Sequence, residues 1–253
     1  LFRSIAIYDG DIPIENKGKG MENIIKTRMA LQKEETKIDT VLIEEPENHL
    51  SYSNLLEMIE DISLNSQNSQ LIITTHESMI ASRLNLKNVI WLSKKDKATM
   101  LDDIEDETAD FFMKADDNKL LQFLLSKKVI LVEGPTEYLL IPEMFRNEFN
   151  KTIEEDNITI ISCGGISYKR YLDIAEKIDK KVCVITDNDG NKERIEEIKE
   201  YNSRHELQKI FTDPNIENYT WEVCLYGLNE DKLKDIIKVK PGSKYSFKGI
   251  DYG

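Results

Sequence analysis

Two apolar segments of the sequence end in acidic residues whose types and spacing suit metal-ion chemistry. The stretch VILVEGPTE places Glu133 directly after a run of apolar residues, and a second acid, Glu137, follows four residues later. The stretch KKVCVITDNDG ends in Asp187 and Asp189. Because side chains two residues apart along a strand point the same way, we expect the two aspartates to form a pair of oxygen ligands. A set of oxygen ligands alone favours Mg²⁺ or Mn²⁺ over zinc.

These acids need neighbouring parallel strands to bring them together. Apolar runs predict strands at 41–44, 71–75, 88–92, 128–133, 158–162 and 181–186. Amphipathic stretches predict helices near 51–64, 77–84, 136–149, 168–179 and 191–200. Near-continuous apolar strands that alternate with helices indicate an α/β fold with a mostly parallel sheet covered on both faces. The carboxyl ends of such strands share one edge of the sheet, where ligands bind.

Each acidic motif also has a purely structural interpretation. D-x-D-G taken alone fits a polar turn with a glycine at positive φ better than it fits a metal site. Glu137 fits the ordinary stabilisation of a helix start by a negative charge. The pairing of E-G after one strand with D-x-D after another favours the metal site, with Glu133, Asp187 and Asp189 as its centre. Such acids repel one another and should titrate as a coupled set.

Two further segments carry candidate residues. ISCGGISYKRY places Gly164 and Gly165 between a predicted strand and a helix, with Lys169 in the first turn of that helix. This arrangement fits a tight turn with a solvated base equally as well as a close approach to a phosphodiester that Lys169 neutralises. In NYTWEVCL, Glu222 lies in an otherwise apolar segment, where a charge is costly unless it is paired or bound to metal.

The first third of the chain contains a second group of motifs. DTVLIEEPENHL runs from a predicted strand into Glu44 and Glu45, which could hold Mg²⁺ through water and orient an attacking water; an acidic helix start fits that motif equally well. QLIITTHES ends the next predicted strand on His76, where the side chain could contact a γ-phosphate. NKGKGMENIIKT places Gly18 and Gly20 before an amphipathic helix, whose exposed amide groups suit a phosphate.

Composition sets limits on the whole chain. The 253 residues carry a net charge of −13, which argues against non-specific coating of nucleic acid but not against a metal-dependent nuclease. The three cysteines lack metal-ligand spacing and indicate reduced thiols. No apolar run reaches the roughly 20 residues of a membrane span. The chain opens on Leu1 rather than Met, which suggests a fragment. The charged stretch at 94–118 predicts a solvated connector between two α/β units.

In this order, the motifs resemble those of the OLD (overcoming lysogenisation defect) family, in which an ABC-type ATPase precedes a Toprim nuclease domain. The resemblance covers about residues 16–226. It implies the second half of an ABC-type ATPase domain at 1–95, a connector at 96–126 and a Rossmann-like Toprim domain at 127–253. Gly18 and Gly20 resemble the signature motif, Glu44 and Glu45 the Walker B acids, and His76 the switch histidine.

The resemblance implies a metal-dependent DNA endonuclease. Glu133 and the aspartates would act in catalysis and metal binding, Glu137 would bind the second metal ion, and Glu222 resembles a further ligand. No Walker A loop occurs in this chain, so its ATP site is incomplete and ATP would act between paired ATPase heads. The family further implies a prokaryotic cytoplasmic location, a homo-oligomer and a role in anti-phage defence beside an accessory protein.

Two other classes of protein remain open. One is a DNA-repair ATPase of the RecF/SMC type, in which the acids of the C-terminal unit are structural. The other is a regulatory subunit with a non-catalytic Toprim domain, which the acidic net charge suits. The intact E-G and D-x-D motifs argue against a degenerate site.

Overall fold

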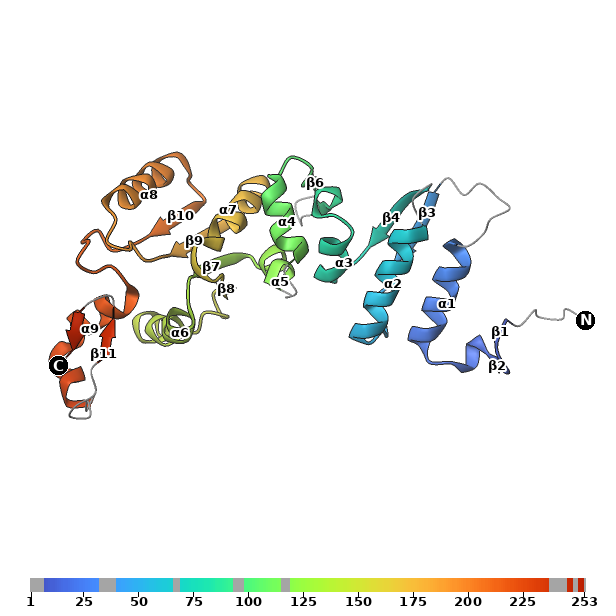
Figure 1. Cartoon of the computed structure of the whole chain (residues 1–253), viewed down its shortest axis with the longest axis horizontal. Helices are drawn as coiled ribbons and strands as arrows, with labels where there is room; N and C mark the ends of the chain where they lie inside the picture. Colours follow the sequence, from blue (N-terminus) through green and yellow to red (C-terminus); the bar gives the residue numbers. More distant parts are fainter. Residues whose placement is uncertain are drawn as a thin grey trace, which may run out of the picture. The chain divides into compact units, whose positions relative to one another are not determined.

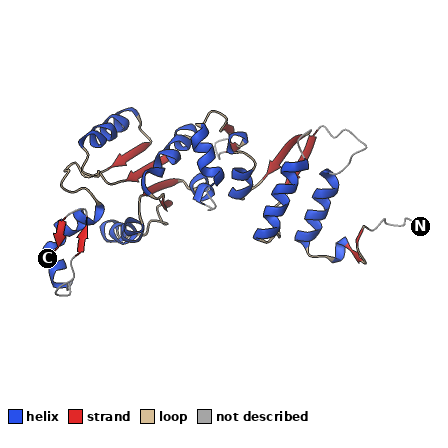
Figure 2. Cartoon of the chain, viewed as in Figure 1, coloured by secondary structure: helices blue, strands red, loops and turns tan. Residues whose placement is uncertain are grey.

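The computed structural model describes residues 7–31, 40–65, 69–92, 98–114, 119–236, 245–247 and 250–252. Two compact units divide these residues: 1–126 together with 170–179 form unit 1, and 127–169 together with 180–253 form unit 2. Helices and strands alternate along most of both units (Figures 1 and 2). The predicted α/β class with parallel strand pairing is therefore confirmed.

Unit 1 begins with a small hairpin and continues as an α/β arrangement. The first part of this unit contains β1 (Tyr8–Asp9), β2 (Ile12–Pro13), η1 (Ile14–Asn16), α1 (Lys19–Leu31), β3 (Thr40–Glu44), α2 (Tyr52–Asn65), β4 (Gln70–Thr74) and α3 (Ser78–Arg83). Strands β3 and β4 are parallel, with Glu44 opposite Thr74 at their carboxyl ends. The buried core joins α1, α2 and α3 through Ile24, Leu55, Met58, Ile59, Ile62 and Ile80. This core holds the ends of β3 and β4 at one edge.

The segment expected to be a solvated connector is folded instead. It contributes β6 (Ala98–Met100), α4 (Asp106–Lys114) and α5 (Lys119–Leu125), after η2 (Leu86–Asn88) and β5 (Ile90–Leu92). Strand β5 pairs with β6 in the antiparallel direction, so this predicted strand is not part of a parallel sheet. Leu101, Phe112 and Phe123 are each at most 2% exposed. Their burial explains why the charged composition misleads: a few apolar side chains at helical spacing are enough to pack the segment into unit 1.

Helix α7 (Tyr168–Lys177) supplies most of its residues to unit 1, although it follows β8 in sequence. The Tyr171 ring lies edge-on to the rings of Phe112 and Phe123, at centroid distances of 4.9 and 5.1 Å. Arg170 pairs with Glu105 and Glu107, and Lys177 pairs with Asp103. The first residues of this helix, 168 and 169, belong to unit 2.

Unit 2 is built on a four-stranded parallel sheet in the order β10-β9-β7-β8. Its elements are β7 (Lys128–Val132), α6 (Pro135–Phe149), β8 (Ile158–Ser162), η3 (Gly165–Ser167), β9 (Lys181–Ile185), α8 (Lys192–Arg204), β10 (Gln208–Phe211), α9 (Trp221–Ile236), β11 (Tyr245–Phe247) and β12 (Ile250–Tyr252). Val132 of β7 lies opposite Ile185 of β9. The residues that follow these two strands therefore emerge side by side at the carboxyl edge. None of the helices in the described ranges is long and apolar enough to cross a membrane.

Candidate functional site

The sheet of unit 2 brings Glu133 next to the D-x-D segment. Glu133 follows β7, and its Oε1 accepts a hydrogen bond from the Thr186 hydroxyl, the first residue after β9. The backbone N–H of Asp187 lies 3.3 Å from the same oxygen. Strand order thus accounts for the placement of Glu133, since β7 and β9 are hydrogen-bonded neighbours that end at the same level.

Glu137 lies in the first turn of α6 with only 5% of its surface exposed. Its carboxylate lies close to the loop after β7: a Cβ added to Gly134 would be only 3.0 Å from Glu137 Oε2. Gly134 is in an extended conformation, with φ −129°, so space rather than backbone strain explains the glycine. Pro135 occupies the first turn of α6, where the absence of an N–H costs nothing.

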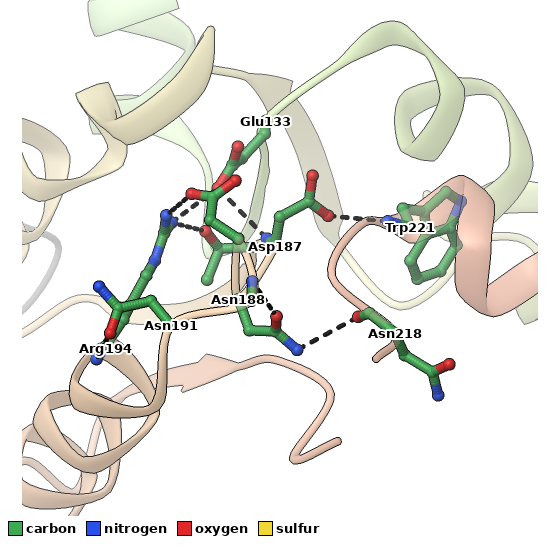
Figure 3. Close-up of polar contacts among 10 residues, drawn as sticks. Glu133, Asp187, Asn188, Asn191, Arg194, Asn218 and Trp221 are labelled. Carbon is green, nitrogen blue, oxygen red and sulfur yellow. Dashed lines mark hydrogen bonds and ion pairs between the residues drawn. The ribbon is translucent and has the colours of Figure 1, made fainter. Parts of the chain in front are cut away.

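Asp187 is directed towards the start of α9. Its Oδ1 accepts a hydrogen bond of 2.8 Å from the backbone N–H of Trp221, the residue before Glu222 (Figure 3). The pKa of Asp187 is raised to about 6. Burial is the largest cause, the charges of Glu133, Glu137 and Glu222 also raise it, and the Trp221 hydrogen bond lowers it. The start of α9 therefore brings Glu222 into the same acidic environment.

The pKa of Glu137 is also raised. Burial is the largest cause, and the negative charges of Glu222 and Glu133 add to it. Glu133 and Glu222 thus lie close enough to Glu137 and Asp187 to disfavour the charged forms of those two acids. We call Glu133, Glu137, Asp187 and Glu222 the acidic cluster. An arrangement of acids that repel one another is typical of a site built for a cation.

Asp189 does not continue β9, although the spacing of the two aspartates predicted that both follow the alternation of a strand. Strand β9 ends at Ile185, and Asp189 has φ 53°, in the left-handed region that few non-glycine residues adopt. Its N–H donates to the Tyr219 carbonyl over 3.1 Å, and its carboxylate pairs with Arg194 of α8. The expectation that both aspartates point the same way is therefore wrong, because the alternation of a strand no longer applies beyond Ile185.

Asn188, between the two aspartates, fixes the neighbouring loop. It is 1% exposed, and its side-chain amide lies within hydrogen-bonding distance of the carbonyls of Asp213 and Asn215, at 2.9 Å each, and of Asn218, at 3.2 Å. Figure 3 shows the contact with Asn218. Its Oδ1 accepts from the Gly190 N–H at 2.7 Å. Sequence reasoning assigned no role to this residue, although an amide can satisfy several carbonyls at once. Asn188 holds the segment that leads to Trp221 and Glu222 beside the acidic cluster.

Arg194 is a second residue that sequence reasoning did not single out. Its guanidinium donates to Glu133 Oε1 over 3.0 Å and to the Thr186 hydroxyl over 2.6 Å, and it pairs with Asp189. The only signal in the sequence is a basic residue five positions after Asp189, which is common on helix surfaces. Its place between two predicted metal ligands becomes visible only once β7, β9 and α8 are folded together.

Lys169 and the two glycines lie at the start of α7. Gly164 and Gly165 have φ values of 73° and 60°, and a Cβ on either would meet open space, so backbone conformation explains both glycines. Lys169 is exposed in the first turn of α7. Its role at a phosphate stays a prediction.

The donor chemistry of the acidic cluster fits a divalent cation. Its members offer only carboxylate oxygens, and burial makes the charges of Glu137 and Asp187 costly without a counter-ion. As these side chains lie, no three His, Cys, Asp or Glu groups in the described part of the chain are arranged to hold a metal ion. Two of the predicted ligands, Glu133 and Asp189, are paired with Arg194 instead.

In unit 1, the ends of β3 and β4 bring two of the predicted ATPase residues, Glu45 and His76, close to each other, with His76 in contact with Glu47. Glu47 Oε1 accepts from the Thr75 hydroxyl at 2.7 Å and from the His76 N–H at 2.8 Å, and it lies 3.2 Å from His76 Nδ1. Glu45 lies farther from the same ring nitrogen, at 3.8 Å, and accepts from Asn48 at 2.7 Å. Glu44 is the last residue of β3 and is exposed. Sequence reasoning thus found this edge but missed Glu47 as the residue that contacts His76.

Gly20 has a packing role in unit 1. It is buried in the first turn of α1, and a Cβ there would lie only 2.2 Å from the His49 carbonyl oxygen. Asn23 of the same helix donates to the Asn48 carbonyl at 3.3 Å. Around Gly18 a Cβ would meet nothing within 4 Å. The close approach of α1 to the turn after β3 explains Gly20, and phosphate binding by this helix start stays a prediction.

In comparisons with known proteins, two family models match separate segments of the chain. A family model described as an AAA ATPase domain matches residues 3–81, and one described as overcoming lysogenization defect protein-like, TOPRIM domain, matches residues 124–189. No curated protein matches the chain. The matches define an ATPase segment followed by a Toprim domain. They confirm the resemblance to the OLD family of ATPase–Toprim proteins.

Proposed function

We propose that this chain is part of a metal-dependent DNA endonuclease whose cleavage is coupled to an ABC-type ATPase. The observation that carries the proposal is the acidic cluster at the carboxyl edge of the sheet in unit 2, where burial and mutual repulsion raise the pKa values of Asp187 and Glu137. Nuclease and ATPase domains of these types use divalent metal ions and ATP, as both matched domains imply.

Two Mg²⁺ or Mn²⁺ ions would supply an activated water and stabilise the leaving 3′ oxygen. Glu133, Asp187 and Asp189 would hold them at the ends of β7 and β9. Glu137 and Glu222 would complete the ligand set from α6 and α9. Lys169 would neutralise the scissile phosphate from the first turn of α7. The D-x-D loop, fixed by Asn188, would keep these donors in place during the reaction.

The ATPase residues would act on a nucleotide shared between two chains. Gly18 and Gly20 at the start of α1, the acids Glu44 and Glu45, and His76 would complete an ATP site with a partner subunit in a homo-oligomer. Glu47, through its contacts with Thr75 and His76, would hold the histidine at that site. Anti-phage defence in a prokaryotic cytoplasm, with an accessory protein, is the context that the family resemblance favours.

A cleavage assay on supercoiled plasmid DNA, with and without Mg²⁺, Mn²⁺ and ATP, tests the proposal. The protein should nick the DNA only with a divalent metal ion, and Asp187→Asn should abolish nicking while it keeps an acceptor for the Trp221 N–H. Asp231→Ala, which removes an exposed acid of α9, is the matched control and should cleave like the wild type. Equal cleavage by the wild type and Asp187→Asn would refute the assignment. Metal-dependent ATP hydrolysis without any DNA cleavage would favour a DNA-repair ATPase instead.

A further inference from the structure

Arg194 occupies the space between two acids that the proposed function assigns to metal ions. One guanidinium nitrogen lies 3.0 Å from Glu133 Oε1 and 2.6 Å from the Thr186 hydroxyl, and another pairs with Asp189 (Figure 3). The side chains of Arg194 and Glu133 are 16% and 18% exposed, so solvent screens this ion pair only in part. The Tyr168 hydroxyl also hydrogen-bonds to Arg194 and Thr186. Two hydroxyl side chains, Thr186 and Tyr168, and two acids, Glu133 and Asp189, thus form one connected network around the guanidinium.

Helix stability does not explain the position of Arg194. It lies in the first turn of α8, where the partial positive charge of the helix start disfavours a cation. Asn191 caps this helix by accepting from the N–H groups of Glu193 and Arg194, so the backbone needs no help from the arginine side chain. The side chain is directed instead across the loop to the ends of β7 and β9.

The second acid of the pair is held in an unfavourable backbone conformation. Asp189 has φ 53°, and its N–H is fixed by the Tyr219 carbonyl. Residues held in such sparsely populated conformations cluster at functional sites, where the surrounding structure maintains them. This conformation directs the Asp189 carboxylate to the same guanidinium that contacts Glu133.

We infer that Arg194 is an internal counter-ion, which competes with divalent metal ions for Glu133 and Asp189. The inference rests on the proposed function, because it takes these two acids as metal ligands. A positive charge within hydrogen-bonding distance of both acids opposes the approach of a second cation. Metal binding at Glu133 and Asp189 therefore requires the guanidinium to leave them or to bind less favourably, and Arg194 is a positioning residue that sets the metal affinity.

The same geometry also admits the opposite effect. If Arg194 served only to hold Glu133 and Asp189 in place for the metal ion, its removal would disorder the ligands and weaken metal binding. If Arg194 competes with the metal ion, removing its side chain should tighten metal binding and should make the metal-free protein less stable than the wild type. The sign of the change in metal affinity therefore decides between the two effects.

The test is to remove bound metal from the 253-residue chain with EDTA and to titrate it with Mn²⁺ by isothermal titration calorimetry. The change in Mn²⁺ affinity between the wild type and each variant gives the sign. Arg194→Met should bind Mn²⁺ about tenfold more tightly than the wild type, because the competing charge is gone. Its Tm in EDTA should fall, and the rise in Tm on adding Mn²⁺ should be larger than in the wild type. Arg204→Met is the matched control, since Arg204 lies in the last turn of the same helix and pairs with exposed Glu200. It should bind Mn²⁺ like the wild type.

Arg194→Lys keeps the charge and provides a second variant if Arg194→Met does not fold. Its Mn²⁺ affinity should stay within about threefold of the wild type, because lysine still places a positive charge near the acids. Unchanged or weaker binding by Arg194→Met, or a gain by Arg194→Lys as large as that of Arg194→Met, would overturn the inference alone. Failure of the wild type to bind Mn²⁺, or equal binding by Asp187→Asn, would overturn the metal site of the proposed function as well.

Discussion

Glu22 in unit 1 and Glu137 in unit 2 are two buried acids in similar local sequences with opposite electrostatic environments. Each lies in the first turn of a helix shortly after a glycine, and their exposed fractions are 7% and 5%. Lys26 and Lys19 hydrogen-bond to Glu22 at 2.6 and 2.9 Å and lower its pKa to about 2. Burial, Glu222 and Glu133 raise the pKa of Glu137. The first acid is neutralised by its own helix, and the second is surrounded by other acids.

The difference separates a structural acid from a candidate ligand. The negative charge at a helix start that explains Glu22 would suit Glu137 equally well from sequence alone. If helix stabilisation were the main role of Glu137, a nearby cation or open solvent would serve it better than burial beside two acids. The folded environment therefore favours the metal-ligand interpretation of Glu137, which the sequence left open.

The largest expected effect is on DNA cleavage by variants of these two acids. Glu137→Gln should lower the metal-dependent cleavage rate by about a hundredfold or more, because it removes a charge from the proposed ligand set. Glu22→Gln should cleave at close to the wild-type rate, since its carboxylate binds only lysines of its own helix. Initial rates on supercoiled DNA with Mn²⁺ measure both. Equal losses in the two variants would show that the comparison reflects folding rather than function.

The sequence predicted the strands and their carboxyl edge well, because apolar runs and the following acids are local features. Strands β3, β4, β7, β8 and β9 lie within one or two residues of their predicted ranges. The short strands β6 and β10 were not predicted, since three or four residues with few apolar side chains give no periodic signal. Helices α4 and α5 were missed because the charged composition around them concealed their apolar side chains.

The candidate site was predictable as far as its acids were concerned. Glu133 and Asp187 meet because β7 and β9 are neighbouring parallel strands that end at the same level. The basic and amide partners, Arg194 and Asn188, depend on the path of the chain after β9, where regular structure ends. Gly20 appeared only as a glycine before a helix, yet it is required by a close contact with the His49 carbonyl that only the fold reveals.

The glycines before the two acids provide the next largest difference, in stability. Gly20→Ala should lower the free energy of unfolding by about 2 kcal/mol, because the new Cβ would overlap the His49 carbonyl oxygen, 2.2 Å away. Alanine has a higher helix propensity than glycine, which would offset part of this loss. Gly134→Ala should cost below about 1 kcal/mol, since the atom it meets at 3.0 Å is the mobile end of Glu137. Urea unfolding measures both, and a larger loss for Gly134→Ala would contradict the packing argument.

The smallest expected effect is on the pH dependence of the metal-free protein. Folding raises the pKa of Asp187 from 3.8 to about 6, so its contribution to stability is fully present below pH 3.8 and is lost as the pH rises through about 6. Folding lowers the pKa of Glu22 from 4.5 to about 2, so its contribution is present above pH 4.5 and is lost as the pH falls through about 2. The stability of the metal-free protein should therefore fall towards neutral pH because of Asp187 and towards low pH because of Glu22.

Thermal unfolding in EDTA between pH 3 and pH 8 tests this assignment, with shifts in Tm of about a few degrees. Asp187→Asn should reduce the loss of Tm between pH 4 and pH 7, because its side chain no longer becomes charged beside Glu133, Glu137 and Glu222. Glu22→Gln should lower the Tm at neutral pH by a roughly constant amount and reduce the further loss below pH 4. Adding Mn²⁺ should raise the Tm of the wild type most at neutral pH, where the acids of unit 2 are charged. A wild-type profile that Asp187→Asn leaves unaltered would mean that the acidic cluster imposes no cost on folding, and the contrast with Glu22 would then fail.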